Sequence, residues 1–257
     1  MPRPAVPNSA LPPVLFVGAG PGSADLLTLG AAKAIAGAEV ILHDRLVGPE
    51  ILALAPPGAR LVEVGKEGFG AAMPQAEINA LIVAHGLSGR RVVRVKSGDG
   101  GIFGRLDEEL DAVRAAGLSF EILPGVTSAA AAAAAIGQSL TRRGRNGSLR
   151  IVTGHDAEGF AEQDWRALAR PGEVAAIYMG KRAARFLQGR LMMHGADPST
   201  PVTLVENASR PDERILSATL ATLPAVAEAA TGPAVILLGL APRRAAPALA
   251  QLREAAR

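Results

Sequence analysis

The stretch from Val14 to Ser23 constrains the fold of this chain more than any other. Four apolar residues, Val-Leu-Phe-Val, predict a strand that is buried on both faces. Glycines follow at alternate positions, at 18, 20 and 22, and an apolar helical periodicity begins behind them at Leu26. Such a strand, turn and helix lets a ligand approach bare backbone, because glycine has no Cβ. A buried turn without a ligand can also carry several glycines.

The spacing of these glycines departs from the Gly-x-Gly-x-x-Gly loop of dinucleotide-binding proteins. The third glycine comes one position early, at Gly22, and Ser23 stands where it is expected. Pro21 also removes an amide donor that a pyrophosphate would use. Asp44, at the end of the next apolar run, keeps a nicotinamide cofactor as an alternative. The stretch therefore predicts a ligand site without identifying its ligand.

Strand and helix patterns alternate five times in the first half of the chain, which predicts a parallel sheet with helices on both sides. The expected strands cover residues 14–17, 38–43, 61–64, 91–95 and 120–123. Polar or glycine-rich residues follow each of them, at 18–22, 44, 66, 96–101 and 124–128. Ligands of such sheets bind outside the carboxyl ends of the strands, so we expect these residues to form one working edge.

Strands outnumber helices in the second half, which predicts a mixed sheet. Expected strands cover residues 149–153, 174–178, 201–206, 214–220 and 234–240. The arginine- and glycine-rich segment near residues 140–148 is expected to link two domains, an N-terminal α/β domain over residues 13–140 and a C-terminal mixed α/β domain over 141–244. Residues 1–12 and 245–257 are expected to be tails, the second of them a terminal helix.

Composition excludes several functional classes. The chain has no cysteine, and its four histidines show no metal-ligand spacing, so we expect no metal. The net charge of +3 is too small to indicate nucleic-acid binding, and no basic segment with interleaved aromatic residues is present. No segment has the apolar length of a membrane span, and the first residues do not resemble a secretory signal, so we expect a cytoplasmic protein.

A series of motifs resembles one family, the uroporphyrinogen-III C-methyltransferases of the tetrapyrrole methylase superfamily. The motifs appear in family order between Val14 and about Leu240. They are Val17-Gly18-Ala19-Gly20-Pro21-Gly22, Asp44-Arg45-Leu46-Val47, Val64-Gly65-Lys66, Gln75-x-Glu77-Ile78-Asn79, Lys96-x-Gly98-Asp99, Ile102-Phe103-Gly104-Arg105, Glu108-Glu109, Pro124-Gly125-Val126-Thr127, Leu140-Thr141-x-Arg143, Val152-Thr153-Gly154-His155, Asp164-Trp165, Tyr178-Met179-Gly180 and Thr200-Pro201-Val202.

The resemblance implies a two-domain α/β enzyme that binds S-adenosylmethionine in the cleft between its domains and forms a homodimer. It implies two successive methylations of uroporphyrinogen III, through precorrin-1 to precorrin-2, which leads to sirohaem, cobalamin or haem d1. Two loops depart from the family pattern. Gly100-Gly101 replaces Pro-Phe, and Leu106-Asp107 replaces Gly-Gly. Because glycine is more flexible than proline, these changes bear on substrate fit.

The resemblance assigns catalytic roles to three residues. Asp44 is the proposed proton acceptor, Lys66 the proposed proton donor, and Arg105 binds substrate and takes part in catalysis. Glu108 lies one helical turn after Arg105, on the same helix face, and is a second substrate-binding candidate. The structural alternatives are an aspartate that pairs with a neighbour at a strand end, a surface lysine, and an ordinary Arg–Glu pair on a solvated helix.

The resemblance also implies a cofactor site. Its members are Pro21, Ser97, Gly98, Asp99, Ile102, Thr127, Ser128, Met179 and Ala208. Asp99 is expected to bind the ribose hydroxyls or the methionine amine, and its alternative is a turn aspartate. Met179 is expected to form a soft wall for adenine, and its alternative is a core residue. Three other functions stay open: a sister precorrin C-methyltransferase, a nicotinamide-dependent oxidoreductase, and a ligand-binding protein without catalysis.

Overall fold

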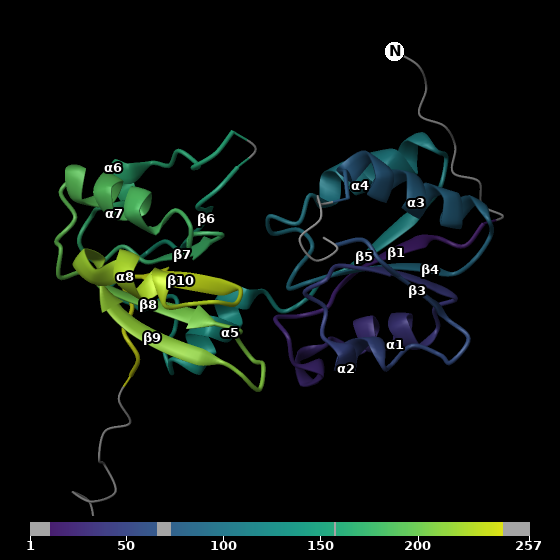
Figure 1. Ribbon diagram of the computed structural model, residues 1–257, viewed down its shortest axis with the longest axis horizontal. Coiled ribbons are helices and arrows are strands. Elements are labelled where there is room, and N and C mark those ends of the chain that lie inside the picture. The colour runs from purple at the N-terminus through teal and green to yellow at the C-terminus, as the bar shows by residue number, and fades with distance from the viewer. Residues whose placement is uncertain (1–10, 66–72, 157, 244–257) are drawn as a thin grey trace, which may run out of the picture. The chain divides into compact units, whose positions relative to one another are not determined.

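The computed structural model describes residues 11–65, 73–156 and 158–243. Tertiary contacts group the chain into two compact units. The first comprises residues 1–131 with 207–212, and the second comprises residues 132–206 with 213–257. The segment Asn207–Asp212 thus packs with the first unit, although its neighbours in sequence belong to the second. Each unit contains a five-stranded sheet (Figure 1).

The first unit is built on a parallel sheet in the order β3-β2-β4-β1-β5. Its strands are β1 (Val14–Gly18), β2 (Val40–His43), β3 (Arg60–Glu63), β4 (Val92–Lys96) and β5 (Phe120–Leu123). Its helices are α1 (Leu29–Ala36), α2 (Pro49–Leu52), α3 (Gln75–Leu87) and α4 (Leu106–Ala115), with a short 3-10 turn at Ala24–Leu26. Helix α5 (Ser128–Ala135) follows β5.

Alternate residues of each central strand point to opposite faces of this sheet, so two cores form. Val14, Phe16, Val40, Leu42 and Val92 pack with α3 and α4 on one face. Val17, Ile41, Val93 and Val95 pack with α1 and α2 on the other. Figure 1 shows the two helix pairs on opposite sides of the sheet. Burial on both faces explains the continuous apolar runs that the sequence shows.

Local sequence signals mark where two helices of the first unit begin. The hydroxyl of Thr28 accepts a hydrogen bond from the amide of Ala31 at 3.1 Å and caps α1. Because the 3-10 turn lies between the glycines and this cap, α1 begins at Leu29 rather than at Leu26. Pro49 occupies the first turn of α2, where its missing amide costs nothing.

The second unit contains a mixed sheet in the order β6-β7-β10-β8-β9. Strands β6 and β7 are parallel, and the other neighbours are antiparallel. The strands are β6 (Arg150–Thr153), β7 (Ala175–Tyr178), β8 (Pro201–Glu206), β9 (Arg214–Thr219) and β10 (Ala234–Leu238). The helices are α6 (Trp165–Leu168), α7 (Ala184–Met193) and α8 (Leu223–Glu228), with a 3-10 turn at Leu220–Thr222. Ile177, Leu204 and Ile236 of the sheet pack against Leu187 and Leu191 of α7.

The predicted fold class, a parallel-rich first sheet followed by a mixed second sheet, is confirmed. The sequence analysis did not predict α8, a short helix without a side-chain cap. The terminal helix expected for residues 245–257 lies outside the described residues. The domain limits at residues 140 and 141 stay a prediction.

Candidate active site

Three adjacent strands of the first unit, β4, β1 and β5, end in glycine loops that pack main chain against main chain. Gly20 and Gly98 exchange two backbone hydrogen bonds, of 3.1 and 2.7 Å. A Cβ atom added to Gly125 would collide with the carbonyl oxygen of Gly98 and with the backbone of Gly18. At these points the loops meet through their main chains, and the close approach leaves no room for a Cβ atom. We call Gly18, Gly20, Gly98 and Gly125 the glycine cradle.

Asp99 ties two loops of the cradle together. Its Oδ1 accepts the amide of Gly101 at 2.8 Å, and its Oδ2 accepts the amide of Gly125 at 3.0 Å. The backbone carbonyl of Asp99 accepts the amide of Ile102 at 3.1 Å and so forms the turn that places Ile102. Each carboxylate oxygen has a second lone pair, so Asp99 keeps capacity for a ligand while it orders the loops.

Ser97, Thr127 and Ser128 lie at the same edge of the sheet. The amide of Ser97 donates to Oδ2 of Asp44 at 3.3 Å. The hydroxyl of Ser128 lies 3.5 Å from the position of a Cβ on Gly98. Thr127 accepts the amides of Ala130 and Ala131 through its carbonyl oxygen at the start of α5. The glycine cradle thus has hydroxyl-bearing residues beside it.

The segment Asn207–Asp212 adds Ala208 to this edge of the first unit. Ser209 accepts the amide of Ser23 through its hydroxyl at 3.1 Å, and Arg210 donates to the carbonyl oxygen of Leu46 at 2.6 Å. A Cβ on Gly22 would meet the side chain of Arg210, and the carbonyl oxygen of Ala208 lies 3.3 Å from the same point. Pro21 and Ala208 are both buried.

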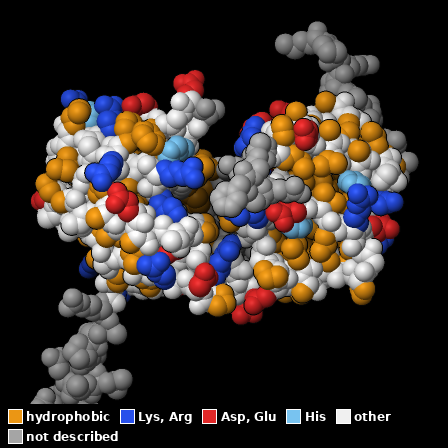
Figure 2. Space-filling model, in the orientation of Figure 1, with side chains coloured by type: hydrophobic (Ala, Val, Ile, Leu, Met, Phe, Trp, Pro, Cys, Tyr) orange, Lys and Arg blue, Asp and Glu red, His pale blue; other side chains and the backbone are white. Residues whose placement is uncertain are grey.

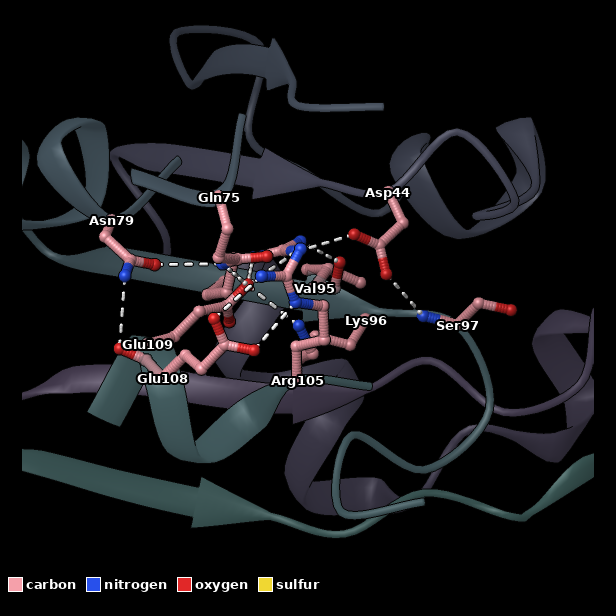
Figure 3. Close-up of polar contacts among 10 residues, drawn as sticks. Asp44, Gln75, Asn79, Val95, Lys96, Ser97, Arg105, Glu108 and Glu109 are labelled. Carbon is pink, nitrogen blue, oxygen red and sulfur yellow. Dashed lines mark hydrogen bonds and ion pairs between the residues drawn. The ribbon is translucent and has the colours of Figure 1, made fainter. Parts of the chain in front are cut away.

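Asp44 lies at the carboxyl end of β2 with both carboxylate oxygens engaged. Its Oδ1 accepts Nη2 of Arg94 at 2.6 Å, in addition to the Ser97 bond at Oδ2. Its side chain is one-third exposed, whereas that of Arg94 is 2% exposed. The partner of Asp44 is therefore a buried arginine of the neighbouring strand, and not Arg45, the neighbour in sequence. Figure 3 shows Asp44 at the end of this polar network, next to Ser97.

The buried cation of Arg94 belongs to a larger polar cluster under the start of α4, which we call the Arg94 cluster (Arg94, Lys96, Glu109 and Gln75). Figure 3 labels Lys96, Glu109 and Gln75 of this cluster. Oε1 of Glu109 accepts Arg94 Nη2 at 3.0 Å, Lys96 Nζ at 2.8 Å and Gln75 Nε2 at 3.3 Å. Oε2 of Glu109 is buried and meets no donor in the part of the chain that the structure describes. Burial lowers the pKa of the Lys96 ammonium, and the nearby Arg94 cation lowers it further, although Glu109 and Asp44 oppose the shift.

Arg105 and Glu108 form a bidentate ion pair on the surface of α4. Arg105 Nε and Nη2 lie 2.7 Å from the two carboxylate oxygens of Glu108. This hydrogen bonding raises the pKa of Arg105 and lowers the pKa of Glu108. Both side chains are about half exposed.

Five of the described residues other than glycine have a positive φ, a strained backbone conformation that is concentrated at functional sites. They are Phe103, Arg105, Met179, Asn207 and Ser209. Arg105 and Met179 are themselves predicted site residues, and Asn207 and Ser209 flank a third, Ala208. Among the described residues, the strain therefore falls at or next to predicted site positions.

Met179 lies in the second unit, at the end of β7, and its side chain is half exposed. Its carbonyl oxygen lies 3.0 Å from Nδ1 of His155. The main chain of Gly154 packs so closely against this oxygen that a Cβ on Gly154 would lie 2.9 Å from it. Gly154 and His155 therefore both contact the main chain of Met179. The exposed Met179 is therefore not a core residue.

Lys66 falls outside the described residues. The other predicted residues of the first unit are those described above at its sheet edge and on α4. The sequence analysis missed Arg94 and Glu109 as members of the site. A signal for Arg94 was present, because a charged residue within the apolar run Val92-Val93-Arg94-Val95 needs a buried partner.

Comparisons with known proteins fit this arrangement. The family of Tetrapyrrole (Corrin/Porphyrin) Methylases matches residues 13–224. The chain belongs to the tetrapyrrole methylases. Siroheme synthases from Tolumonas auensis and Gluconacetobacter diazotrophicus are each 44% identical to this tetrapyrrole methylase, and each alignment covers 88% of the chain. These alignments cover 48% and 49% of the two synthases, so the chain spans about half the length of the curated relatives it matches.

Two solved structures resemble this tetrapyrrole methylase over most of their length. Uroporphyrin-III C-methyl transferase from Thermus thermophilus, complexed with S-adenyl homocysteine, is 37% identical, with a TM-score of 0.77. The match covers 89% of this chain and 97% of that one. A cobalt precorrin-4 methyltransferase, a cobalamin biosynthetic enzyme, is 28% identical, with a TM-score of 0.78 over 88% of this chain and 94% of that one.

Two kinds of feature are absent from the described part of this tetrapyrrole methylase. No helix there is long and apolar enough to cross a membrane. No group of three or more His, Cys, Asp or Glu side chains there is arranged to hold a metal ion. Basic and acidic side chains are interspersed on the face of the first unit that Figure 2 shows, without a continuous basic surface.

Proposed function

We propose that this tetrapyrrole methylase is an S-adenosylmethionine-dependent uroporphyrinogen-III C-methyltransferase. It adds two methyl groups in succession and converts uroporphyrinogen III through precorrin-1 to precorrin-2. The observation that carries the proposal is the 37% identity to the Thermus thermophilus enzyme across 97% of that chain. The siroheme synthases are about twice as long as the matched region, so we do not extend their whole activity to this chain.

The residues at the sheet edge fit the proposed cofactor. The glycine cradle holds the loops after β1, β4 and β5 together, and the proposed ligand, which carries an amino acid group and a ribose, binds beside these loops. Asp99 has free lone pairs for a hydroxyl or an ammonium group. Ile102 provides apolar surface, the buried Pro21 and Ala208 are proposed main-chain contacts, and Ser97, Thr127 and Ser128 provide backbone and hydroxyl contacts. The family resemblance adds Met179 of the second unit, whose polarizable side chain suits adenine.

S-Adenosylmethionine supplies an electrophilic sulfonium methyl group to the reaction. The pyrrole carbon that attacks it is electron-rich, so the contribution of the protein is mainly to position the macrocycle. Attack leaves a cationic macrocycle, and the Asp44 carboxylate stabilises this charge and accepts the proton that the ring then loses. Lys66, outside the described residues, is the proposed proton donor.

Arg105 and Glu108 are the proposed substrate-binding residues. A guanidinium fork binds a carboxylate with two parallel hydrogen bonds, and uroporphyrinogen III carries many carboxylates. In the structure Glu108 occupies this fork. A substrate carboxylate therefore competes with Glu108 for Arg105, which disfavours binding of ligands that lack a carboxylate at this point.

We also propose that the enzyme is a cytoplasmic homodimer that binds neither nucleic acid nor membranes. Support comes from the family resemblance and from the mild net charge of +3. Light scattering coupled to gel filtration measures the mass directly. A monomeric mass at micromolar concentration contradicts the homodimer.

A sister precorrin C-methyltransferase is the second candidate. The cobalt precorrin-4 methyltransferase has a similar TM-score at 28% identity, and the Gly100-Gly101 loop departs from the uroporphyrinogen branch. The nicotinamide oxidoreductase is a weaker candidate, because Pro21 removes a phosphate-binding amide.

One experiment separates these functions. The purified protein is incubated with S-adenosylmethionine and uroporphyrinogen III, and products are separated by liquid chromatography with mass detection. We expect a mono-methylated and then a di-methylated product. Parallel incubations with a methylated precorrin and calorimetry with NAD and NADP test the alternatives. Methylation of the precorrin alone, or binding of a nicotinamide cofactor without methyl transfer, contradicts the proposal.

A further inference from the structure

The Arg94 guanidinium connects Asp44, which the proposed reaction uses, with Glu109 of α4. Its Nη2 lies 2.6 Å from Oδ1 of Asp44 and 3.0 Å from Oε1 of Glu109. Its Nε donates to the same Glu109 oxygen at 3.2 Å, and its Nη1 donates to the carbonyl oxygen of Val95 at 2.9 Å. All three guanidinium nitrogens are therefore engaged, and the side chain is held in one orientation.

We propose that Arg94 is a positioning residue for the methyl transfer, which fixes the Asp44 carboxylate and, through Glu109, the start of α4 that carries Arg105. The inference rests on the proposed function. Arg94 itself is 2% exposed and has no access to a substrate, so it acts only through its partners.

The strand register brings these groups together. Strands β2 and β4 are parallel neighbours, with Leu42 opposite Arg94 and the amide of Asp44 bonded to Val95 at 3.2 Å. Arg94 shares its sheet face with Val92, the face that α3 and α4 cover. Glu109 of α4 meets it there, one residue after Glu108 and four after Arg105. One guanidinium thus contacts both the loop after β2 and the first turns of α4.

The energetics argue against a purely stabilising role. Burying a cation costs several kcal/mol of desolvation, on the order of the gain from its partners. A valine or leucine at position 94 would fill the apolar face at no such cost. The planar guanidinium holds Asp44, Glu109 and the Val95 carbonyl through three nitrogens in a fixed geometry, whereas lysine has one nitrogen on a flexible stem. An arginine at position 94 is therefore explained by its orienting effect on Asp44 and Glu109.

The test is a double-mutant cycle of Arg94→Met and Asp44→Asn, with kcat, KM and the dissociation constant of S-adenosylhomocysteine measured for each variant. We expect Asp44→Asn to lower kcat by about 100-fold or more. In the otherwise wild-type protein, we expect Arg94→Met to lower kcat by at least about tenfold, because displacement of the Asp44 carboxylate slows the reaction by at least this factor. In the Asp44→Asn background the same change should have a smaller effect, because the part that acts through Asp44 is already lost and only the part through Glu109 and α4 remains.

Arg91→Met is the matched control. Arg91 lies just before β4 and is exposed, and its guanidinium donates to the carbonyl oxygen of Gly37 at 2.7 Å and approaches Glu39 at 3.9 Å. We expect it to leave kcat unchanged. Equal effects of Arg94→Met in both backgrounds would show a general structural role and overturn the inference. An inactive wild type contradicts the proposed function instead, so the two failures are distinguishable.

Arg94→Lys covers the case in which Arg94→Met does not fold. It keeps the charge but lacks the fixed planar guanidinium that holds Asp44, Glu109 and the Val95 carbonyl, so we expect a folded variant with lowered kcat and a nearly unchanged dissociation constant for S-adenosylhomocysteine. A crystal structure of this variant should show the Asp44 carboxylate turned away from the amide of Ser97. Full kcat, or an unmoved Asp44 in that structure, overturns the inference.

Discussion

Gly98 and Gly125 touch through their main chains, and a Cβ on Gly125 would lie against the carbonyl oxygen of Gly98. Their loops follow β4 and β5, which flank β1 on its two sides. Gly98 also has a φ of +68°, a conformation that few other residues adopt. The edge of the sheet where we place the cofactor thus depends on two positions that accept only glycine.

Gly125→Ala should destabilise the protein and weaken cofactor binding. The added methyl group cannot be accommodated without moving the backbone of Gly18 or Gly98, and such overpacking costs about 1–3 kcal/mol. Urea denaturation and calorimetry with S-adenosylhomocysteine measure the two effects. Gly58→Ala is the control, because a Cβ there meets nothing within 4 Å. Equal stability of the two variants would contradict the close approach.

Asp99→Asn should reduce the affinity for S-adenosylhomocysteine by about tenfold, roughly 1.4 kcal/mol. One carboxylate oxygen becomes an NH2 group, which cannot accept the amide of Gly101 or of Gly125. The loops after β4 and β5 then lose their common anchor. Asp111→Asn, on the exposed face of α4, serves as the control. Unchanged affinity in Asp99→Asn would remove Asp99 from the cofactor site.

Arg105→Met should abolish most turnover and leave cofactor binding intact. The variant loses the guanidinium that we assign to a substrate carboxylate, and a misplaced substrate costs about 100-fold in rate. Arg114→Met is the control, since Arg114 lies exposed on the same helix and pairs only loosely with Asp111, at 3.8 Å. Steady-state kinetics and calorimetry report the two properties. If S-adenosylhomocysteine affinity falls in parallel with turnover, Arg105 belongs to the cofactor site.

Lys96 should make stability depend on alkaline pH. Burial and Arg94 lower its pKa in the folded state, so the unfolded chain binds more protons between that pKa and the ordinary lysine value. Below the folded-state pKa of Lys96, the folded protein contains a buried ammonium, which lowers its stability. This cost disappears as the pH rises from that pKa toward the pKa of lysine in the unfolded chain, about 10.4. The free energy of unfolding of the wild type, minus that of Lys96→Met, should therefore rise with pH.

Urea denaturation of both proteins between about pH 8 and pH 10 measures this difference, because that range lies below the ordinary lysine pKa. Subtraction of the Lys96→Met curve removes the titration of the other groups. If this difference stays constant or falls with pH, the attraction between Glu109 and the Lys96 ammonium outweighs the cost of burying that ammonium.

Much of the candidate site was predictable because its residues follow strands, and apolar runs mark the strands. Each buried run in the first half ends in glycine or polar residues, and in a parallel sheet these ends share one edge. The exposed Arg105–Glu108 pair was also predictable, since residues three apart on a helix face each other. Local spacing was sufficient in both cases.

Apolar periodicity and motif spacing were enough to predict the strands, most of the helices, the glycine loops between them, and the resemblance to the tetrapyrrole methylases. They did not predict that Arg94 is the partner of Asp44, that Glu109 also pairs with Arg94, or that Asn207–Asp212 packs with the first unit, all of which depend on the folded chain. The reason is that periodicity reports which face of an element is buried, whereas the partner of a buried charge depends on strand order and register. Placing β4 beside β2 brings together two residues fifty positions apart, and no local pattern carries that information.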